Sequence, residues 1–85
     1  MRCLGVWIGP TSFIWTDQQC RNIENVAGFV GNLDECQRAC IEKHRCSAIH
    51  FNPGVGCTLR DCPSPVPTPS SDYGNYVGYY VSGMY

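Results

Sequence analysis

The residues of this chain best suited to chemistry are its cysteines, of which the 85-residue sequence contains seven. Cys36, Cys40 and His44 lie four positions apart and would share one face of a helix, a spacing that could present ligands to zinc. Structural zinc sites usually also contain closely spaced C-x-x-C pairs, and the chain has none. Disulfide bonds are therefore favoured, we expect no metal or other cofactor, and the cysteine density predicts a secreted, extracellular protein.

Side chains that could catalyse a reaction form no recognisable motif. The sequence contains His44, His50 and seven carboxylate residues, but neither G-x-S-x-G nor H-E-x-x-H. We expect His44 to be solvated at a helix end and His50 to lie on the outer face of a strand. The sequence therefore predicts a protein that is not an enzyme.

Charge and hydropathy exclude two classes of partner. Six lysine and arginine residues against seven aspartate and glutamate residues give a net charge of −1, which offers no electrostatic basis for binding nucleic acid. No apolar run approaches the roughly 20 residues that span a bilayer, so membrane insertion is not expected. An extracellular protein or a glycan is the expected partner.

The clearest secondary-structure signal is a helix from Leu33 to Lys43. Asn32 is a capping residue with Glu35 three positions later, a pattern typical of a helix start. Three- and four-residue spacing gives the helix an inward face, which consists of Leu33, Cys36, Ala39 and Cys40.

Two alternating segments, residues 47–52 and 57–60, predict a β-hairpin across a Pro-Gly turn. Folding these segments back on each other gives an inner face with two opposing pairs, Phe51 with Cys57 and Ile49 with Leu59.

The outer face of this hairpin supplies the first candidate binding residues. It carries Ala48, His50, Thr58 and Arg60, and we expect a polar, solvated surface. His50, Thr58 and Arg60 would lie together there, where an arginine could hold a carboxylate or sulfate or stack on a sugar.

The rest of the chain predicts short strands, turns and a proline-rich connector. Residues 3–15 are expected to form one or two strands around a turn, residues 20–23 a short strand, and residues 28–31 a brief strand or turn. Four of the six prolines fall within residues 63–69, an extended connector that cannot join the middle of a sheet. Residues 76–81 predict a closing strand.

The C-terminal segment, residues 73–85, contains all five tyrosines. Tyrosine gives a large amphipathic contact area at low entropic cost, as interfaces favour. Tyr76, Tyr79 and Tyr80 are therefore the second set of candidate binding residues.

Together these elements predict a small, disulfide-rich α+β domain in which one helix packs on a short-stranded antiparallel sheet. We divide the chain into an N-terminal extension, residues 1–19, and a domain, residues 20–85, that contains the connector 63–69. The extension is either a strand and turn or a remnant of a signal peptide.

Helix geometry restricts the pairing of the cysteines. Cys36 and Cys40 lie one turn apart, with about 5–6 Å between Cβ atoms, which is too far for a disulfide between them. Cys40 at the helix end can reach Cys46 after the following turn, and Cys36 then meets Cys57 on the inner face of the hairpin.

This pairing leaves Cys20 for Cys62 and Cys3 as the odd thiol. A Cys46–Cys62 bond is the main alternative, because the hairpin register places those residues opposite each other. Cys3 either belongs to a remnant of a signal peptide or of cloning and has no role, or forms an intermolecular disulfide, or bonds Cys20.

Three segments of the chain resemble the PAN/apple family: ECQRAC at residues 35–40, CSAIHFN at 46–52 and GCTLR at 56–60. The resemblance covers roughly residues 20–81. It implies a helix carrying C-x3-C on a small antiparallel sheet, with inner bridges that correspond to Cys36–Cys57 and Cys40–Cys46. The family's outer bridge would need a cysteine in the closing strand, which has none, so Cys62 or Cys3 must bond Cys20.

The resemblance also implies a function, that of an extracellular, non-catalytic recognition module for a protein or a carbohydrate. The alternative is a structural subunit that self-assembles into a homo-oligomer or filament. Sheet edges, the proline-rich segment and the Tyr/Gly-rich tail would then make the contacts, and Cys3 could lock them.

Overall fold

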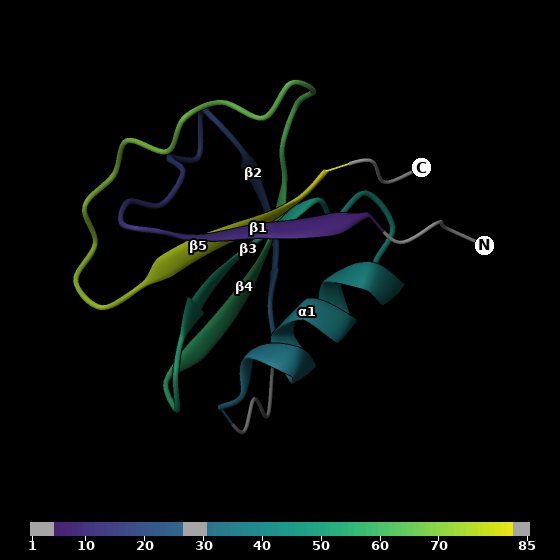
Figure 1. Ribbon diagram of the computed structural model, residues 1–85, viewed down its shortest axis with the longest axis vertical. Helices are drawn as coiled ribbons and strands as arrows, with labels where there is room; N and C mark the ends of the chain where they lie inside the picture. The colour runs from purple at the N-terminus through teal and green to yellow at the C-terminus, as the bar shows by residue number, and fades with distance from the viewer. Residues whose placement is uncertain (1–4, 27–30, 83–85) are drawn as a thin grey trace.

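Five strands and one helix form the part of the chain that the computed structural model describes, residues 5–26 and 31–82 (Figure 1). In chain order they are β1 (Val6–Thr11), β2 (Arg21–Asn25), α1 (Leu33–Glu42), β3 (Ala48–Asn52), β4 (Gly56–Asp61) and β5 (Val77–Ser82). The strands form one sheet in the order β1-β5-β3-β4-β2, and all neighbours are antiparallel. The predicted α+β class, with one helix packed on an antiparallel sheet, is confirmed.

The helix α1 begins at the predicted residue and ends one residue earlier than predicted. Asn32 is its N-cap, and Oδ1 of Asn32 accepts the backbone N–H of Glu35 at 2.8 Å. Glu42 is the last helical residue and Lys43 the C-cap. The predicted inward face packs on the sheet through Leu33, Cys36, Ala39 and Cys40.

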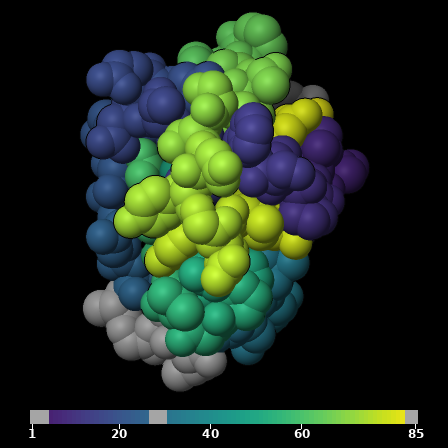
Figure 2. Space-filling model, turned by 90° about the vertical axis from the view of Figure 1, so that its left-hand side faces the viewer, coloured from purple at the N-terminus to yellow at the C-terminus, as the bar shows by residue number. Residues whose placement is uncertain are grey.

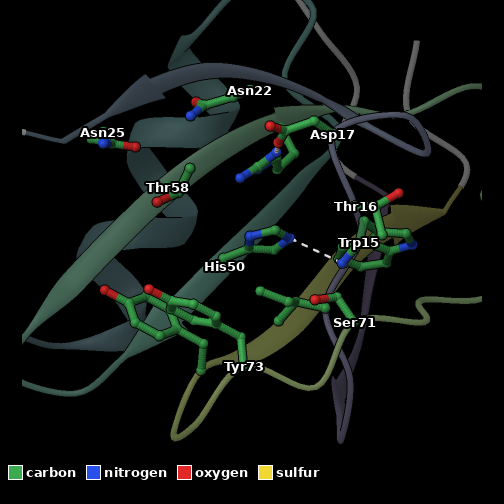
Figure 3. Close-up of a pocket in the computed structure, with 12 residues that line it drawn as sticks. Trp15, Thr16, Asp17, Asn22, Asn25, His50, Thr58, Ser71 and Tyr73 are labelled. Atoms are coloured by element: carbon green, nitrogen blue, oxygen red, sulfur yellow. Dashed lines mark hydrogen bonds and ion pairs between the residues drawn. The ribbon is translucent and has the colours of Figure 1, made fainter.

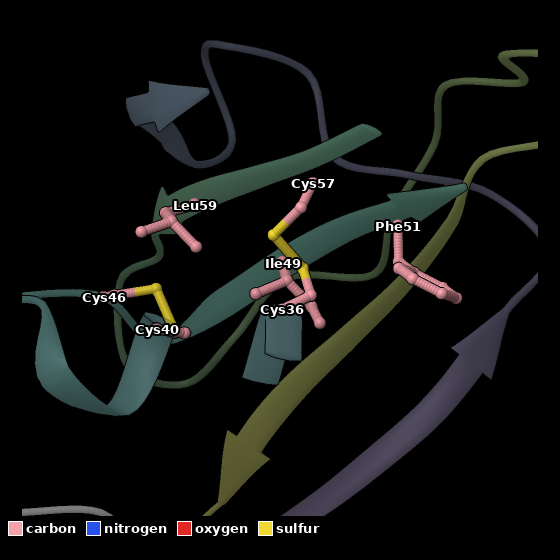
Figure 4. Packing of buried hydrophobic residues seen from close by; sticks show 7 residues of the cluster. All are labelled: Cys36, Cys40, Cys46, Ile49, Phe51, Cys57 and Leu59. Carbon is pink, nitrogen blue, oxygen red and sulfur yellow. A yellow bond between two sulfur atoms is a disulfide. The ribbon is translucent and has the colours of Figure 1, made fainter. Parts of the chain in front are cut away.

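Strands β3 and β4 pair in the predicted register, with Phe51 opposite Cys57 and Ile49 opposite Leu59. None of these four side chains is more than 6% exposed. They pack beneath α1 together with the helix cysteines and Cys46. These seven residues form the main core of the molecule (Figure 4).

Three disulfides fasten the fold: Cys20–Cys62, Cys36–Cys57 and Cys40–Cys46, with S–S distances of 2.06, 2.14 and 2.04 Å. They are the pairs that the sequence favours. The alternative bond between Cys46 and Cys62 is therefore wrong, and Cys20 does not bond Cys3. Cys3 itself lies outside the described residues.

The N-terminal segment contributes an edge strand to the same sheet. β1 pairs with β5, so that Val6 lies opposite Ser82 and Ile8 opposite Tyr80. The closing strand β5 consequently lies between β1 and β3. A strand is confirmed within residues 3–15, whereas the element expected at residues 28–31 lies largely outside the described part.

The sheet face opposite α1, here called the second face, is covered by chain segments. Residues 13–19 and the proline-rich connector 63–69 lie on the side of the sheet away from the helix (Figure 1), and Figure 2 shows the connector and the chain that follows it crossing this side. Trp15, only 1% exposed, anchors the cover, because its Nε1–H donates to the carbonyl oxygen of Pro67 at 2.7 Å.

The expectation of a solvated outer hairpin face is therefore wrong. Ala48, His50 and Arg60 do share that face, but they are 0%, 3% and 9% exposed. The alternation of β3 and β4 correctly separates the two faces. It does not reveal that Trp15, from a distant segment, packs on the more polar one.

Candidate functional site

A pocket of about 450 Å³ opens on the second face (Figure 3). Strands β2, β3 and β4 contribute its floor, and residues 14–17 and 71–76 contribute its walls. A backbone bridge joins the two walls: the N–H of Ile14 donates to Ser71 at 2.8 Å, and the N–H of Ser71 donates back at 2.9 Å. Segments that are far apart in the sequence thus hold the pocket together.

His50 lies on the floor and is fixed by Trp15. The two rings stack with centroids 5.8 Å apart and planes 8° apart, and Nε2 of His50 accepts the backbone N–H of Trp15 at 3.2 Å. Because Nε2 accepts, a neutral ring carries its proton on Nδ1, which points away from Trp15 in Figure 3. Burial first, and then the charge of Arg60, lower the pKa of His50 to about 4 against an opposing effect of Asp17. The ring is therefore neutral at pH 7.

Arg60 and Asp17 form an ion pair at the pocket. Nη1 of Arg60 donates to Oδ1 of Asp17 at 2.6 Å and to the carbonyl oxygen of Cys20 at 3.2 Å. The Asp17 side chain is 80% exposed, whereas that of Arg60 is 11% exposed. Nε of Arg60 is buried and has no hydrogen-bond partner among the described residues. Since His50 is neutral, the two charges of this pair balance each other in the pocket lining.

Tyr73 and Tyr76 form an aromatic wall. They are the ends of one turn, in which the N–H of Tyr76 donates to the carbonyl oxygen of Tyr73 at 3.2 Å. Gly74 in this turn has a φ of 56°, a conformation that residues with a Cβ rarely adopt. The two rings lie 5.7 Å apart, with planes at 53°. Tyr73 is 63% exposed, while the half-buried Tyr76 packs its hydroxyl end on Gly56 of β4.

A bulge in β2 turns two asparagines toward the pocket. Residues three positions apart in a regular strand point to opposite faces. The pairing of β2 with β4 shifts between Asn22 and Glu24, so that Asn22 and Asn25 both line the pocket. Figure 3 shows the two asparagines on the opposite side of the pocket from Tyr73, with Thr58 on the floor between them.

Residues 18–80 match the family model of the PAN domain, well over half of the chain. The chain belongs to the PAN domain family. No curated protein and no solved structure matches the chain significantly. PAN domains are generally non-catalytic modules that bind proteins or carbohydrates.

This PAN domain gathers four of the six predicted binding residues in its pocket: His50, Thr58, Arg60 and Tyr76. The other two do not line it. Tyr79 packs against the main core, and Tyr80 meets the Trp15 ring edge-on, with centroids 6.1 Å apart. A binding role for all six residues stays a prediction, and the structure shows that Tyr79 and Tyr80 also take part in packing.

Sequence reasoning missed several pocket residues, among them Trp15, Asp17, Asn22, Asn25 and Tyr73. For Tyr73 a signal exists, since a Tyr-Gly-Asn-Tyr segment predicts a turn with tyrosine at both ends. For the asparagines there is none, because strand alternation assumes a regular strand and the bulge breaks it.

The pocket of this PAN domain offers donors, acceptors and ring faces. No group of three His, Cys, Asp or Glu side chains is placed to hold a metal in the described part of the chain. Cys36 and Cys40 cannot join His44 as zinc ligands, because both sulfurs are bonded to other cysteines. None of the helical structure described is long and apolar enough to cross a membrane. The lining is suited to holding a polar ligand.

Proposed function

We propose that this PAN domain is an extracellular, non-catalytic recognition module that binds its protein or carbohydrate partner at the pocket on the second face. One observation carries the proposal: the pocket combines His50, Thr58, Arg60 and two tyrosines in a single concave surface. Its volume of about 450 Å³ lies within the range of roughly 300–1,000 Å³ that is usual for ligand pockets.

The disulfides support the extracellular setting, because such bonds persist in oxidising compartments and are rare in the cytosol. One of them also supports the pocket. Cys20 follows the wall at residues 14–17, and Cys62 leads into the connector that precedes the wall at residues 71–76. The Cys20–Cys62 bond therefore ties both walls to the same point of the sheet.

Binding to arrays of extracellular proteins and of glycans tests this proposal, with the oxidised protein as the probe. Thr58→Arg places a long side chain on the pocket floor, and we expect it to lower affinity more than tenfold for every partner found. Gln37→Arg introduces the same side chain on α1, on the other face, and should leave binding unchanged. Tyr73→Ala, at a 63% exposed position, removes part of the wall without touching the core. Unchanged binding by both folded pocket variants would overturn the proposal.

Self-assembly is a second candidate, and the edge strand β1 favours it. Val6 and Ile8 of this strand are 69% and 39% exposed, and one side of the strand pairs with no other strand among the described residues. Light scattering over a concentration series tests it. Growth of the particle mass, abolished by Val6→Lys, would support assembly through this edge, and a constant monomer mass would exclude it.

A further inference from the structure

We infer that the pocket recognises an uncharged saccharide unit, an inference that rests on the proposed function and names its ligand class. The juxtaposition that carries it is an exposed tyrosine ring facing two asparagine amides across a pocket whose lining has no net charge. Three properties of the lining lead to this class of ligand: its charge balance, its aromatic wall and its hydrogen-bonding groups.

The charge balance disfavours an anionic ligand. Arg60 is the cation of the lining, and its Nη1 is already bonded to Asp17 at 2.6 Å. An incoming carboxylate or sulfate would compete with Asp17 for the guanidinium of Arg60. The negative charge of Asp17 would also repel it. The neutral His50 ring adds no positive charge at pH 7. An uncharged ligand pays neither of these costs.

The aromatic wall suits the apolar face of a sugar ring. A pyranose presents a patch of C–H groups on one face and hydroxyl groups around its edge. Tyr73 is 63% exposed, its backbone carbonyl accepts the N–H of Tyr76, and its ring lies 5.7 Å from that of Tyr76. A flat, accessible ring of this kind provides apolar contact and a polar hydroxyl at low entropic cost.

The opposite side of the pocket supplies paired donors and acceptors for hydroxyl groups. Asn22 and Asn25 each carry an amide oxygen and an amide N–H2, and Thr58 can both donate and accept. His50 can donate only through Nδ1–H, because Nε2 accepts from Trp15. A ligand rich in hydroxyl groups satisfies such a mixture better than an apolar side chain could.

The size of the site favours one or two sugar rings over a protein surface. Standard protein interfaces bury about 800 Å² on each partner and are formed by 20–30 residues a side. This pocket is a single concavity of about 450 Å³, lined by residues from a few short segments. We therefore expect the end of a glycan chain to enter it.

An array of neutral oligosaccharides, with hexose or N-acetylhexosamine ends, tests the inference against matched sialylated and sulfated forms. We expect neutral members to bind and acidic counterparts to bind more weakly. Titration calorimetry with a bound neutral oligosaccharide then measures the variants. Tyr73→Ala should weaken binding about tenfold, the upper range for loss of one ring contact. Asn25→Ala should weaken it by a similar factor, since it leaves hydroxyl groups without a partner.

Two controls match these variants outside the pocket. Phe13 is a 46% exposed aromatic residue that does not line the pocket, and Gln37 carries an amide side chain on α1, on the other face of the sheet. Phe13→Ala and Gln37→Ala should bind as the unmodified protein does. Thermal unfolding of all four variants checks that they are folded.

The outcomes separate this inference from the proposed function. Binding of acidic glycans alone, or neutral-glycan binding that survives both pocket substitutions, overturns the inference. The inference is also overturned by a protein partner that fails to bind Tyr73→Ala, if neutral sugars and glycosidase treatment leave its binding to the unmodified protein unchanged. The proposed function stands in that case. A partner that binds the Tyr73→Ala and Thr58→Arg variants as tightly as it binds the unmodified protein overturns both the inference and the proposed function.

Discussion

The imidazole of His50 stacks on the indole of Trp15 with ring planes 8° apart, and its Nε2 accepts the backbone N–H of the same residue. One side chain of β3 is thereby joined twice to the segment that forms a wall of the pocket. The hydrogen bond requires the unprotonated nitrogen, since a protonated imidazole has two donors and no acceptor. The attachment of this wall to the sheet consequently depends on the protonation of His50.

Acidification should destabilise the fold through His50. Its pKa falls from 6.5 to about 4 on folding, so the unfolded chain binds the proton more tightly. The stabilisation is fully present above pH 6.5 and is lost as the pH falls toward 4. We expect the free energy of unfolding to drop by about 2–3 kcal/mol over this range from this residue. Chemical denaturation at several pH values measures the drop.

Two variants isolate the contribution of His50 to this drop. His50→Gln keeps an acceptor for the Trp15 N–H but cannot gain a proton near pH 5, so its stability should change less between pH 7 and pH 4. His44→Gln, at an exposed position, should follow the unmodified protein. Equal slopes for His50→Gln and His44→Gln would contradict the assigned role.

Gly56→Ala should disturb ligand binding through Tyr76. A Cβ at position 56 would collide with the hydroxyl end of Tyr76, while the backbone there needs no positive φ. Because the far end of a side chain can move, the loss of stability should be small, at most about 1 kcal/mol. The tyrosine wall shifts with Tyr76, so we expect a several-fold loss of affinity for any pocket ligand.

A double-mutant cycle checks that this effect passes through the tyrosine. In a Tyr76→Ala background the three atoms nearest to the added methyl group, all from the Tyr76 side chain, are gone, so Gly56→Ala should then cost no further affinity. Additive losses from the two substitutions would show that Gly56 acts by another route.

The features that could be predicted from the sequence are those set by local periodicity. The Asn32 cap starts α1, and the alternation of β3 and β4 fixes which residues face the helix. Cysteine positions on these elements then determine Cys36–Cys57 and Cys40–Cys46, since a helix turn separates the two sulfurs of α1.

The features that could not be predicted depend on distant segments or on irregular geometry. Trp15 covers a face that looks polar in β3 and β4, and nothing local links it to Pro67. The bulge in β2 reverses the direction expected for one of its asparagines. The candidate site lies where these two features meet, which is why only its residues on the predicted hairpin and tail were found.

Removing single disulfides should destabilise the fold in order of loop length. The Cys20–Cys62 bond spans 42 positions and the Cys40–Cys46 bond six. Loop-closure entropy predicts losses of about 4 kcal/mol and about 2 kcal/mol, respectively, for double substitution by alanine. Denaturant unfolding of both variants measures the difference. A larger loss for the short loop would mean that packing of the buried Cys40 and Cys46 side chains outweighs chain entropy.

Asp17→Asn should change which saccharides the pocket accepts. The asparagine oxygen can still accept the Arg60 N–H, but the lining becomes net positive. We expect a sulfated or sialylated oligosaccharide to gain about two- to fivefold in affinity, the effect of one solvent-exposed charge, while a neutral one binds as before. Glu42→Gln removes the same charge from an exposed residue of α1, on the other face of the sheet, and should give a smaller gain. Titrations at low and high salt measure both, because screening should abolish the gain. Equal gains for the two variants would assign the effect to overall charge and contradict the charge balance inferred for the pocket.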